Sequence, residues 1–289
     1  ERDYIGLLAP LSYEQSAPLG FLWLSKLWTT LFGIDQLSLR LPVFISAVIS
    51  LFLFYSAAMR ILRQPYLIIA TLWLGSHQMF VRYASEYKQY MFDLLVTILL
   101  LWMGCTQRKL TRHNWQWITL IGILCIWMSM PSIFMLISLI IFYFVNRNID
   151  ESHRYLILMI VGVVLSFVAN YIVMLEPTIS SDHMQNYHNS FFLQGRFWNV
   201  DSLSHDLGLI ESVARMLVGK SAVAIIAALL LFIIGCRIAI KRSESVVLLL
   251  VLPIVGAFGA SLLGLYSLID RLMLFVLPLL ILMILYSVQ

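Results

Sequence analysis

Long apolar runs constrain the fold of this chain more than any other feature of its sequence. Nine of them cover residues 41–59, 66–81, 91–105, 117–130, 132–145, 155–175, 221–236, 245–264 and 272–288. In lipid the backbone must satisfy its own hydrogen bonds, which only helices and closed barrels do, and these runs lack the alternation of barrel strands. We therefore predict an all-α, polytopic transmembrane helical bundle, with residues 1–289 forming one domain of about nine membrane helices.

The composition supports a membrane protein and gives no sign of a nucleic-acid partner. Hydrophobic residues make up 61% of the chain and charged residues 12%, whereas a soluble domain has about 45–50% and ~25%. The net charge is +4, but the Lys and Arg residues are scattered through short loops and form no basic patch. The three cysteines fall in or at the end of apolar runs, so we predict no disulfide framework.

The positive-inside rule predicts the topology. It also decides whether residues 115–145 form one helix kinked at Pro131 or a hairpin, because only a hairpin keeps the basic segments 107–114 and 146–154 on one side. Alternation then places the long segments 1–40 and 176–220 on the outer face. The predicted cytoplasmic loops carry Arg60, Arg63, Arg108, Lys109, Arg112, Arg147, Arg154, Arg237, Lys241 and Arg242.

The first polar constellation lies in the opening loop. Ser16 and Pro18 can begin a helix that Gly33 ends, and its leucines and tryptophans predict an apolar side suited to the membrane interface. The residues just before it are candidate site residues: Tyr13, Glu14 and Gln15. The alternative is an interfacial anchor with a solvated Glu14.

The second constellation is RYASEYKQYMFD, residues 82–93. If the following helix extends backward, four positions share one face: Arg82, Glu86, Gln89 or Tyr90, and Asp93, with Lys88 to the side. Asp93 then enters the hydrocarbon, where an ionisable group is costly unless it is paired or faces a wet cavity. The alternative is a structural Arg82–Glu86 pair plus a Lys88 that extends to the interface.

The third constellation combines the long outer loop 176–220 with the mouth of the last span. The loop is aromatic and polar, includes His188, matches no standard zinc spacing, and predicts a lid over a substrate. Residues 204–218 predict an amphipathic helix leading back to the membrane. Tyr266 and Arg271 lie at the mouth of the last span, where Arg271 meets an anionic headgroup or acts as a simple anchor.

Missing motifs narrow the class of activity. There is no GxSxG, HExxH, P-loop or Rossmann glycine pattern, so nothing indicates a soluble-type hydrolase or a nucleotide-driven machine. A transporter or flippase with an ion site at Glu86 and Asp93 stays open, although the spans after Cys105 are nearly free of charges. A membrane O-acyltransferase needs a His deep in a span, and His77 comes closest to that position.

Three stretches carry a resemblance to a known family. They are QSAPLGF with the downstream LRLP, SEYKQYMFDLL, and the final YSLIDRLMLFVLPLL. The chain resembles, over almost its whole length, the bacterial GT-C glycosyltransferases related to protein O-mannosyltransferases and to the aminoarabinose transferase of lipid A. By that resemblance it is a fragment without the family's N-terminal helix and C-terminal part.

The resemblance implies a reaction and a location. Such enzymes transfer a sugar from a polyprenyl-phosphate-linked donor to a lipid, glycan or protein acceptor on the periplasmic face of the bacterial inner membrane. By the resemblance, the family's acidic pair lies upstream of Glu1, and Glu14 corresponds to a second acidic residue of the aminoarabinose transferases. The resemblance implies no certain cofactor and leaves open whether a divalent cation takes part. Glu14, Glu86 and Asp93 are the predicted catalytic residues. The predicted substrate-binding residues are Tyr13, Gln15, Arg82, Lys88, Tyr90, His188, Tyr266 and Arg271.

Overall fold

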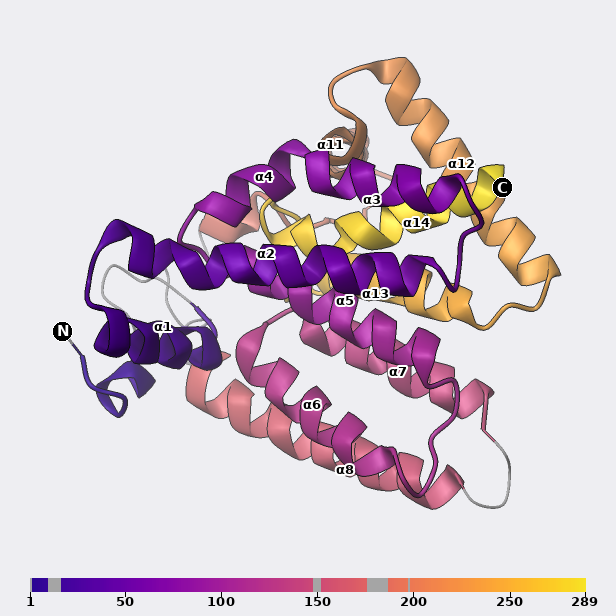
Figure 1. Ribbon diagram of the computed structural model, residues 1–289. Helices are drawn as coiled ribbons and strands as arrows, with labels where there is room; N and C mark the ends of the chain where they lie inside the picture. Colours follow the sequence, from indigo (N-terminus) through magenta and orange to yellow (C-terminus); the bar gives the residue numbers. More distant parts are fainter. Residues whose placement is uncertain (1, 10–16, 148–151, 176–186, 197) are drawn as a thin grey trace.

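The computed structural model describes residues 2–9, 17–147, 152–175, 187–196 and 198–289, which form helices and no β-strand (Figure 1). This confirms the predicted all-α class. The α-helices are α1 Leu19–Phe32, α2 Gln36–Ala58, α3 Tyr66–Ser76, α4 Gln78–Ser85, α5 Tyr90–Thr106, α6 Trp115–Met128, α7 Ser132–Val145, α8 Ser152–Asn170, α11 Val200–Val218, α12 Ala222–Lys241, α13 Val246–Leu262 and α14 Leu277–Val288. The 3-10 turns η1 Gly6–Leu8 and η4 Leu272–Val276 and the π-helical turn η3 Tyr171–Leu175 complete the described elements.

Three described helices are long and apolar enough to cross a membrane: α2, His153–Met174 and α12. Helices α4 and α5 make a fourth span if their bent pair is counted as one. Shorter apolar helices account for the remaining runs: Tyr66–Ser76, Trp115–Met128, Ser132–Val145, Val246–Leu262 and Leu272–Val288. Every predicted run therefore contains a helix, and the protein is a polytopic membrane protein, while the count of nine spans stays a prediction.

Helices α5 and α14 form the centre of the bundle. Both are apolar nearly all round, and almost every residue of each is buried, as expected for helices with neighbours on all sides. Helix α5 packs against α2, α7 and η4, while α14 packs against α12 and α3. The peripheral helices instead expose large apolar side chains, among them Phe52, Leu165 and Val223, which is the arrangement lipid stabilises.

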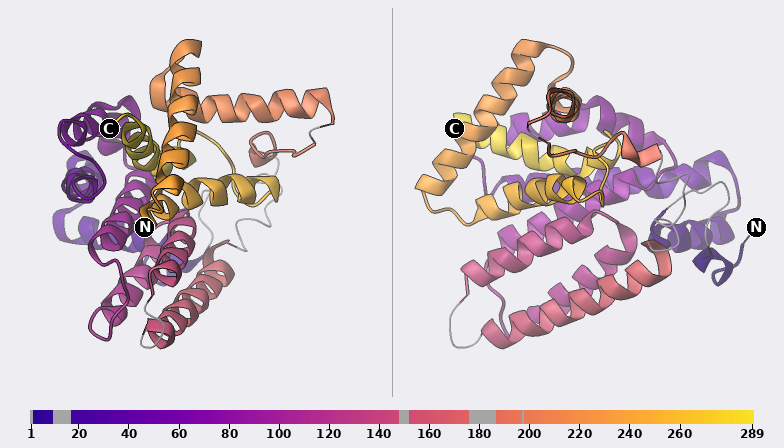
Figure 2. Two further views of the ribbon diagram at one scale, coloured as in Figure 1. Left: turned by 90° about the vertical axis from the view of Figure 1, so that its right-hand side faces the viewer. Right: turned by 180° about the vertical axis from the view of Figure 1, so that it is seen from behind.

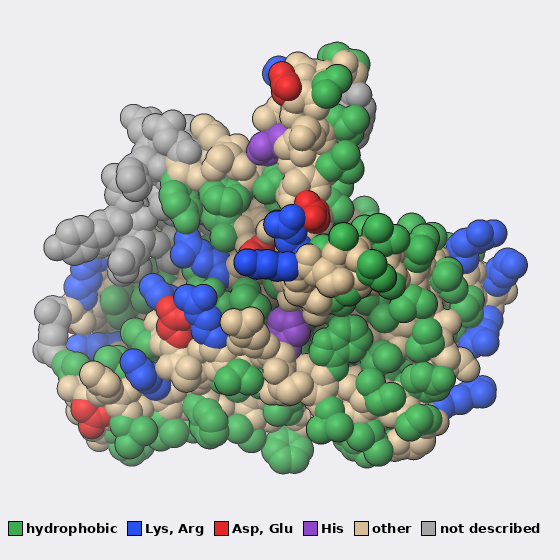
Figure 3. Space-filling view, turned by 90° about the horizontal axis from the view of Figure 1, so that it is seen from above, with side chains coloured by type: hydrophobic (Ala, Val, Ile, Leu, Met, Phe, Trp, Pro, Cys, Tyr) green, Lys and Arg blue, Asp and Glu red, His purple; other side chains and the backbone are tan. Residues whose placement is uncertain are grey.

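The basic loops gather at one end of the bundle. In Figure 1 the turns after α2, α5, α7 and α12 all lie on the right, and Figure 3 shows Lys and Arg side chains along the same edge. We call this the basic end, defined by residues 59–65, 107–114, 146–147, 152–154 and 237–245 among those described. The turns that carry the candidate site residues lie at the other end, which we call the site end.

The structure confirms two predicted features. The opening helix is α1, which Pro18 precedes and which ends at Gly33, where φ is 83°. Residues 115–145 form the hairpin, with α6 and α7 as separate helices that run in opposite directions (Figure 1).

Three features differ from the prediction. The run 66–81 is broken at His77, whose Nδ1 accepts a hydrogen bond from the backbone N–H of Met79 and so begins α4. The single helical face from Arg82 to Asp93 is wrong, because α4 ends at Ser85, α5 begins at Tyr90, and the two helices are bent by 117°. The amphipathic helix α11 also begins earlier than predicted, because the Asn199 side chain accepts from the N–H groups of Asp201 and Ser202.

Candidate functional site

The turn between α13 and η4 presents Asp270 and Arg271 at the site end. The turn starts at Gly264, where φ is 68°. The Tyr266 hydroxyl then donates to the carbonyl of Leu272 at 2.7 Å, and its ring stacks edge-on against Phe134 and Phe275. Burial raises the pKa of Tyr266 well above its ordinary value, with smaller contributions from Asp93 and Tyr90. Tyr266 therefore stays a neutral phenol that fixes the turn.

Arg271 is the cation at the centre of the candidate site. Its Nη2 donates to the Tyr187 hydroxyl at 3.1 Å, and its guanidinium carbon lies 5.9 Å from the centre of the Tyr187 ring. Its buried Nε has no hydrogen-bond partner among the described residues. A buried guanidinium N–H without an acceptor is costly, so this arrangement is suited to an anion that supplies one.

His188 lies beside Arg271. Burial lowers the pKa of His188, and the nearby Arg271 charge lowers it further. The buried Nδ1 of His188 also lacks a hydrogen-bond partner among the described residues. At neutral pH the ring is thus a neutral imidazole within range of the Arg271 charge, and its Nδ1 is unsatisfied as far as the described residues go.

The segment 187–195 that carries Tyr187 and His188 is tied down at three points. The carbonyl of Phe191 accepts from the N–H of Leu268 at 3.0 Å, and the N–H of Leu193 donates to Ser261 Oγ at 3.0 Å. The third tie comes from α11, where the Asp206 carboxylate accepts from the N–H of Gln194 at 2.8 Å and of Gly195 at 2.9 Å. Burial raises the pKa of Asp206, but these hydrogen bonds outweigh burial and lower it overall.

A second wall of the site comes from the break between α4 and α5. The Arg82 Nε lies 3.4 Å from Glu86 Oε2 in an exposed ion pair, and the rings of Tyr83 and Tyr90 stack edge-on at 5.0 Å. The charge of Arg271 acts on the hydroxyls of both tyrosines. The tertiary structure therefore brings residues 82–90 close to Arg271, about 180 positions later in the chain.

Asp93 lies deeper, in the first turn of α5. It is 4% exposed, the Ser129 hydroxyl lies beside it, and its Oδ1 has no hydrogen-bond partner among the described residues. Asp93 also forms no ion pair with any described residue. The ion pairs among those residues are Arg82–Glu86, His205–Asp206 and Arg215–Glu211. Asp93 is thus a buried, unpaired carboxyl below the wall formed by Tyr90 and Tyr266.

The predicted site residues fall into three groups. The structure brings together Arg82, Glu86, Tyr90, Asp93, His188, Tyr266 and Arg271. Lys88 lies in the same break, with its side chain exposed. Tyr13, Glu14 and Gln15 lie outside the described residues.

Sequence reasoning missed several contributors to this site. Tyr187 and Asp206 were part of the predicted lid but had no role of their own, and Tyr83, Ser129 and Ser212 were not singled out. Ser212 Oγ donates to Asp270 Oδ1 at 2.6 Å, which ties α11 to the turn of Arg271. The sequence did contain a signal for Ser129, since it is a polar residue two positions before Pro131 at the end of an apolar run.

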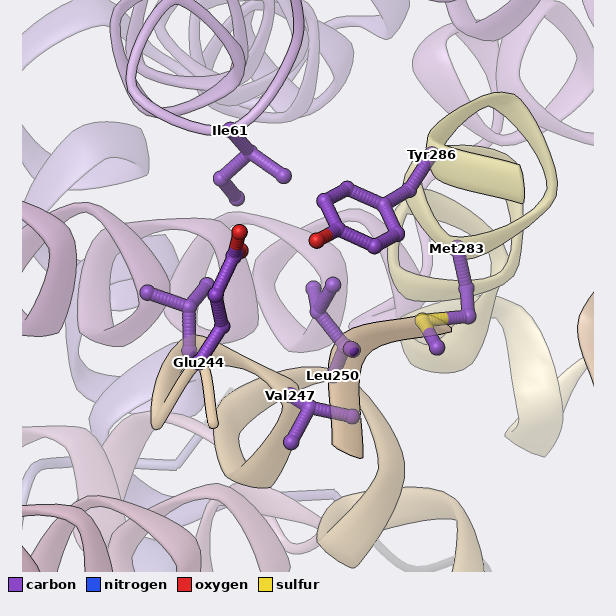
Figure 4. A pocket seen from close by; sticks show the side chains of 8 residues that line it. Ile61, Glu244, Val247, Leu250, Met283 and Tyr286 are labelled. Carbon is purple, nitrogen blue, oxygen red and sulfur yellow. The ribbon is translucent and has the colours of Figure 1, made fainter. Parts of the chain in front are cut away.

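The described part of the chain has no group of three or more His, Cys, Asp or Glu residues that could hold a metal ion. A cavity of about 10 Å³ lies away from the candidate site, at the basic end, where Figure 4 shows the Tyr286 hydroxyl pointing toward Glu244 above apolar side chains. That volume holds about one water molecule.

Comparison with known proteins gives one match. The family model described as dolichyl-phosphate-mannose-protein mannosyltransferase matches residues 16–172, which is more than half of the chain. The match includes the break at residues 82–93 and ends before the segment that carries Tyr187. Searches of curated proteins and of solved structures found no match.

Proposed function

This chain belongs to the dolichyl-phosphate-mannose-protein mannosyltransferase family, and from that premise we propose that it transfers a sugar from a polyprenyl-phosphate-linked donor to an acceptor hydroxyl. The reaction takes place at the site end, on the face of the membrane opposite the basic loops. The acceptor is a lipid, a glycan or a protein. By the positive-inside rule we expect the basic loops to face the cytoplasm, and we therefore assign the site to the periplasmic side of a bacterial inner membrane.

The chemistry needs one cation and one base. The acceptor oxygen forms a bond to the anomeric carbon as the bond from that carbon to the phosphate oxygen breaks. The bonding electron pair leaves with the phosphate, and the acceptor proton passes to a carboxylate. A positioned cation stabilises the charge that grows on the phosphate, and a positioned base typically contributes 10²–10⁴-fold.

Arg271 is the residue that carries this proposal. It is partly buried, one of its nitrogens donates a hydrogen bond to the Tyr187 hydroxyl, and its Nε lacks an acceptor among the described residues. A donor phosphate supplies the missing acceptor oxygen, and an Arg fork binds phosphate in a fixed geometry. His188 lies within range of the Arg271 charge, and its unsatisfied Nδ1 can accept a hydrogen bond from a sugar hydroxyl or, in the tautomer that carries the proton there, donate one to a phosphate oxygen.

Glu86 and Asp93 are the acidic residues of this proposal within the described part of the chain. Glu86 is partly exposed and lies on the wall that faces Arg271, so it can reach an acceptor hydroxyl. Asp93 is buried one helical turn after Tyr90 in α5. We assign it to the floor of the site, where its charge acts on Tyr266. Glu14 stays a predicted supporting acid in the opening loop.

The remaining candidates have lesser roles. The Arg82 guanidinium is paired with Glu86 and orients that carboxylate, while the exposed Lys88 attracts the anionic donor to the rim of the site. Tyr90, Tyr266 and the opening-loop residues Tyr13 and Gln15 form walls for the sugar and the acceptor.

The test uses full-length protein reconstituted in liposomes with a radiolabelled polyprenyl-phosphate sugar. Replacing Lys88 and Arg271 together with Ala should abolish sugar transfer and weaken donor binding. The matched control replaces Arg215 and Lys220 with Ala, because both are exposed cations at the same end and Arg215 is already paired with Glu211. If the Lys88 and Arg271 variant binds donor and transfers sugar as well as the control, the phosphate assignment is wrong.

The transporter alternative is less favoured. It rests on Asp93, because an unpaired carboxyl within a bundle is common in ion pathways. The family membership favours a transferase instead. The same liposomes distinguish the two, since a transporter moves the labelled lipid or ion across the bilayer without forming a glycosylated product.

A further inference from the structure

Helix α11 lies across the bundle. Figure 1 looks along its axis, whereas α2 and α8 run across that picture, and the left view of Figure 2 shows α11 from the side. Its C-terminal end leads through residues 219–221 directly into the membrane span α12. A helix that is perpendicular to the spans and joined to the end of one lies parallel to the membrane surface.

One face of α11 packs on the protein. Its buried residues are Ser202, Asp206, Leu209, Val213, Ala214, Met216 and Leu217. The carbonyl of Met216 lies 2.9 Å from His77 Nε2, and Ser212 and Asp206 tie the helix to residues 270 and 194–195. These contacts fix the rotation of α11 about its own axis.

The opposite face is polar. It carries Ser204, Glu211 and Arg215, and the last two form an ion pair at 2.7 Å. Such an exposed i,i+4 pair is typical of a helix surface in water. This face therefore points toward the aqueous phase.

Between these two faces lies an apolar edge whose side chains are exposed in the described part of the chain. Val200, Leu203 and Leu207 follow one another at spacings of three and four residues and are 80%, 36% and 55% exposed. Trp198 lies just before the helix and is 83% exposed. Among the described residues, the apolar arc of α11 is thus wider than its buried face.

We propose that this edge of α11, formed by Trp198, Val200, Leu203 and Leu207, lies in the headgroup region of the membrane and contacts lipid. Helices with a large apolar arc, a charged opposite face and an exposed tryptophan bind at this depth. The C-terminal end of α11 leads into the candidate span α12, whose first residues Val223 and Ile226 are 79% and 58% exposed, as expected of a surface that faces lipid. This inference does not depend on the transferase activity.

Site-directed spin labelling of the full chain in liposomes tests the proposal. Cys105, Cys125 and Cys236 are first replaced by Ala or Ser, and single cysteines are then introduced for labelling. Leu203→Cys and Leu207→Cys probe the apolar edge, Ser204→Cys and Glu211→Cys are matched controls on the polar face, and Ile226→Cys marks the lipid-facing surface of a span. Collisions with oxygen report lipid, and collisions with a water-soluble nickel chelate report water.

The expected result is a ratio of oxygen to nickel collisions several-fold higher at 203 and 207 than at 204 and 211, and closer to that at 226. Equal ratios at all four α11 positions would show that the edge is in water. Protection of 203 and 207 from both reagents would show that a second copy of the chain or another protein covers the edge. Either of these results overturns the proposal.

A second measurement uses the native tryptophans and replaces only one residue at a time. Lipids brominated near the headgroup should quench part of the tryptophan fluorescence of the wild-type protein in liposomes, and Trp198→Phe should remove that part. Trp102→Phe is the control, because the Trp102 indole donates to Ser56 Oγ within the bundle. An unchanged quenched fraction in Trp198→Phe would overturn the placement of the edge in the membrane.

Discussion

The Arg271 guanidinium donates a hydrogen bond to the Tyr187 hydroxyl across 3.1 Å, although the two residues are 84 positions apart. Tyr187 belongs to a segment that hydrogen bonds tie to α11 and to the turn after α13, and Arg271 lies in that same turn. The position of the guanidinium is therefore fixed by Tyr187 on another segment as well as by the flexible side chain of Arg271 itself. A pre-oriented cation binds an anion at a lower entropic cost.

Tyr187→Phe should weaken donor use while the fold is kept. The ring remains beside Arg271, but the exposed hydrogen bond is lost, which is worth about 1 kcal/mol or roughly a fivefold rise in KM for the donor. The measurement is steady-state sugar transfer at varied donor concentration. A kcat that falls while KM is unchanged would contradict this positioning role.

Asp93→Asn should leave the fold nearly as stable as the wild type. No cation pairs with this carboxyl within the described residues, so an amide of the same shape should lower the free energy of unfolding by less than about 1 kcal/mol. Asp93→Ala should cost more, because it leaves a cavity. Denaturation in mixed micelles checks this, and a loss of about 3–5 kcal/mol for Asp93→Asn would indicate a broken buried ion pair instead.

The tie between Asp206 and residues 194–195 should weaken only in acid. Hydrogen bonds to the carboxylate lower its pKa overall despite burial, so the stabilisation is complete above the ordinary value of 3.8 and is lost as the pH falls through the lower pKa of the folded protein. Protection of the Gln194 and Gly195 amides, measured relative to the intrinsic exchange rate at each pH, should therefore stay high above the ordinary value of 3.8 and fall only as the pH drops below it.

Asp206→Asn provides the matched variant for that measurement. Its amide nitrogen faces a backbone N–H, which leaves one buried donor unsatisfied at about 1–3 kcal/mol. In this variant the amide that faces the Asn nitrogen should lose its protection relative to the intrinsic exchange rate at every pH, while the amide that faces the Asn oxygen keeps part of its protection. Protection equal to that of the wild type near pH 5 would contradict the role of the carboxylate.

Gly20→Ala should destabilise the contact between α1 and α6. A Cβ at this position would lie 2.8 Å from the carbonyl oxygen of Trp127 and 2.6 Å from Met128 Sδ, and the backbone atom cannot move away easily. We expect a loss of about 1–3 kcal/mol, measured as a lower thermal unfolding temperature in detergent.

Gly208→Ala is the control for that prediction. Gly208 lies within α11 and has nothing within 4 Å of a built Cβ, so the substitution should be neutral or stabilise the protein by about 0.5–1 kcal/mol. Equal effects at the two glycines would show that the approach of α1 to α6 does not limit stability.

The positions of the apolar runs along the sequence predicted much of the fold. Each of the nine apolar runs contains a helix, and the distribution of Arg and Lys decided the hairpin at Pro131. Local capping signals placed α1 between Pro18 and Gly33. These features follow from a few neighbouring residues and from the cost of exposing a backbone or a charge to lipid.

The breaks within apolar segments could not be predicted in this way. His77 interrupts a hydrophobic run because its ring accepts from Met79 and contacts the carbonyl of Met216, which is 139 residues away. The 117° bend between α4 and α5 separated residues that helical spacing had placed on one face. In both places, a contact or direction set by distant elements overrides the local pattern.

The sequence by itself determined the class of the protein, because apolar length and charge position act locally in a membrane. It also supplied the family resemblance that the matched family model confirms over residues 16–172. Only the tertiary structure decided which polar residues meet: it brought Arg271 beside Tyr187, His188 and Tyr90, and it buried Asp93 without a cation. Those encounters depend on how helices far apart in the chain pack and bend, and the periodicity of each helix carries no information about them.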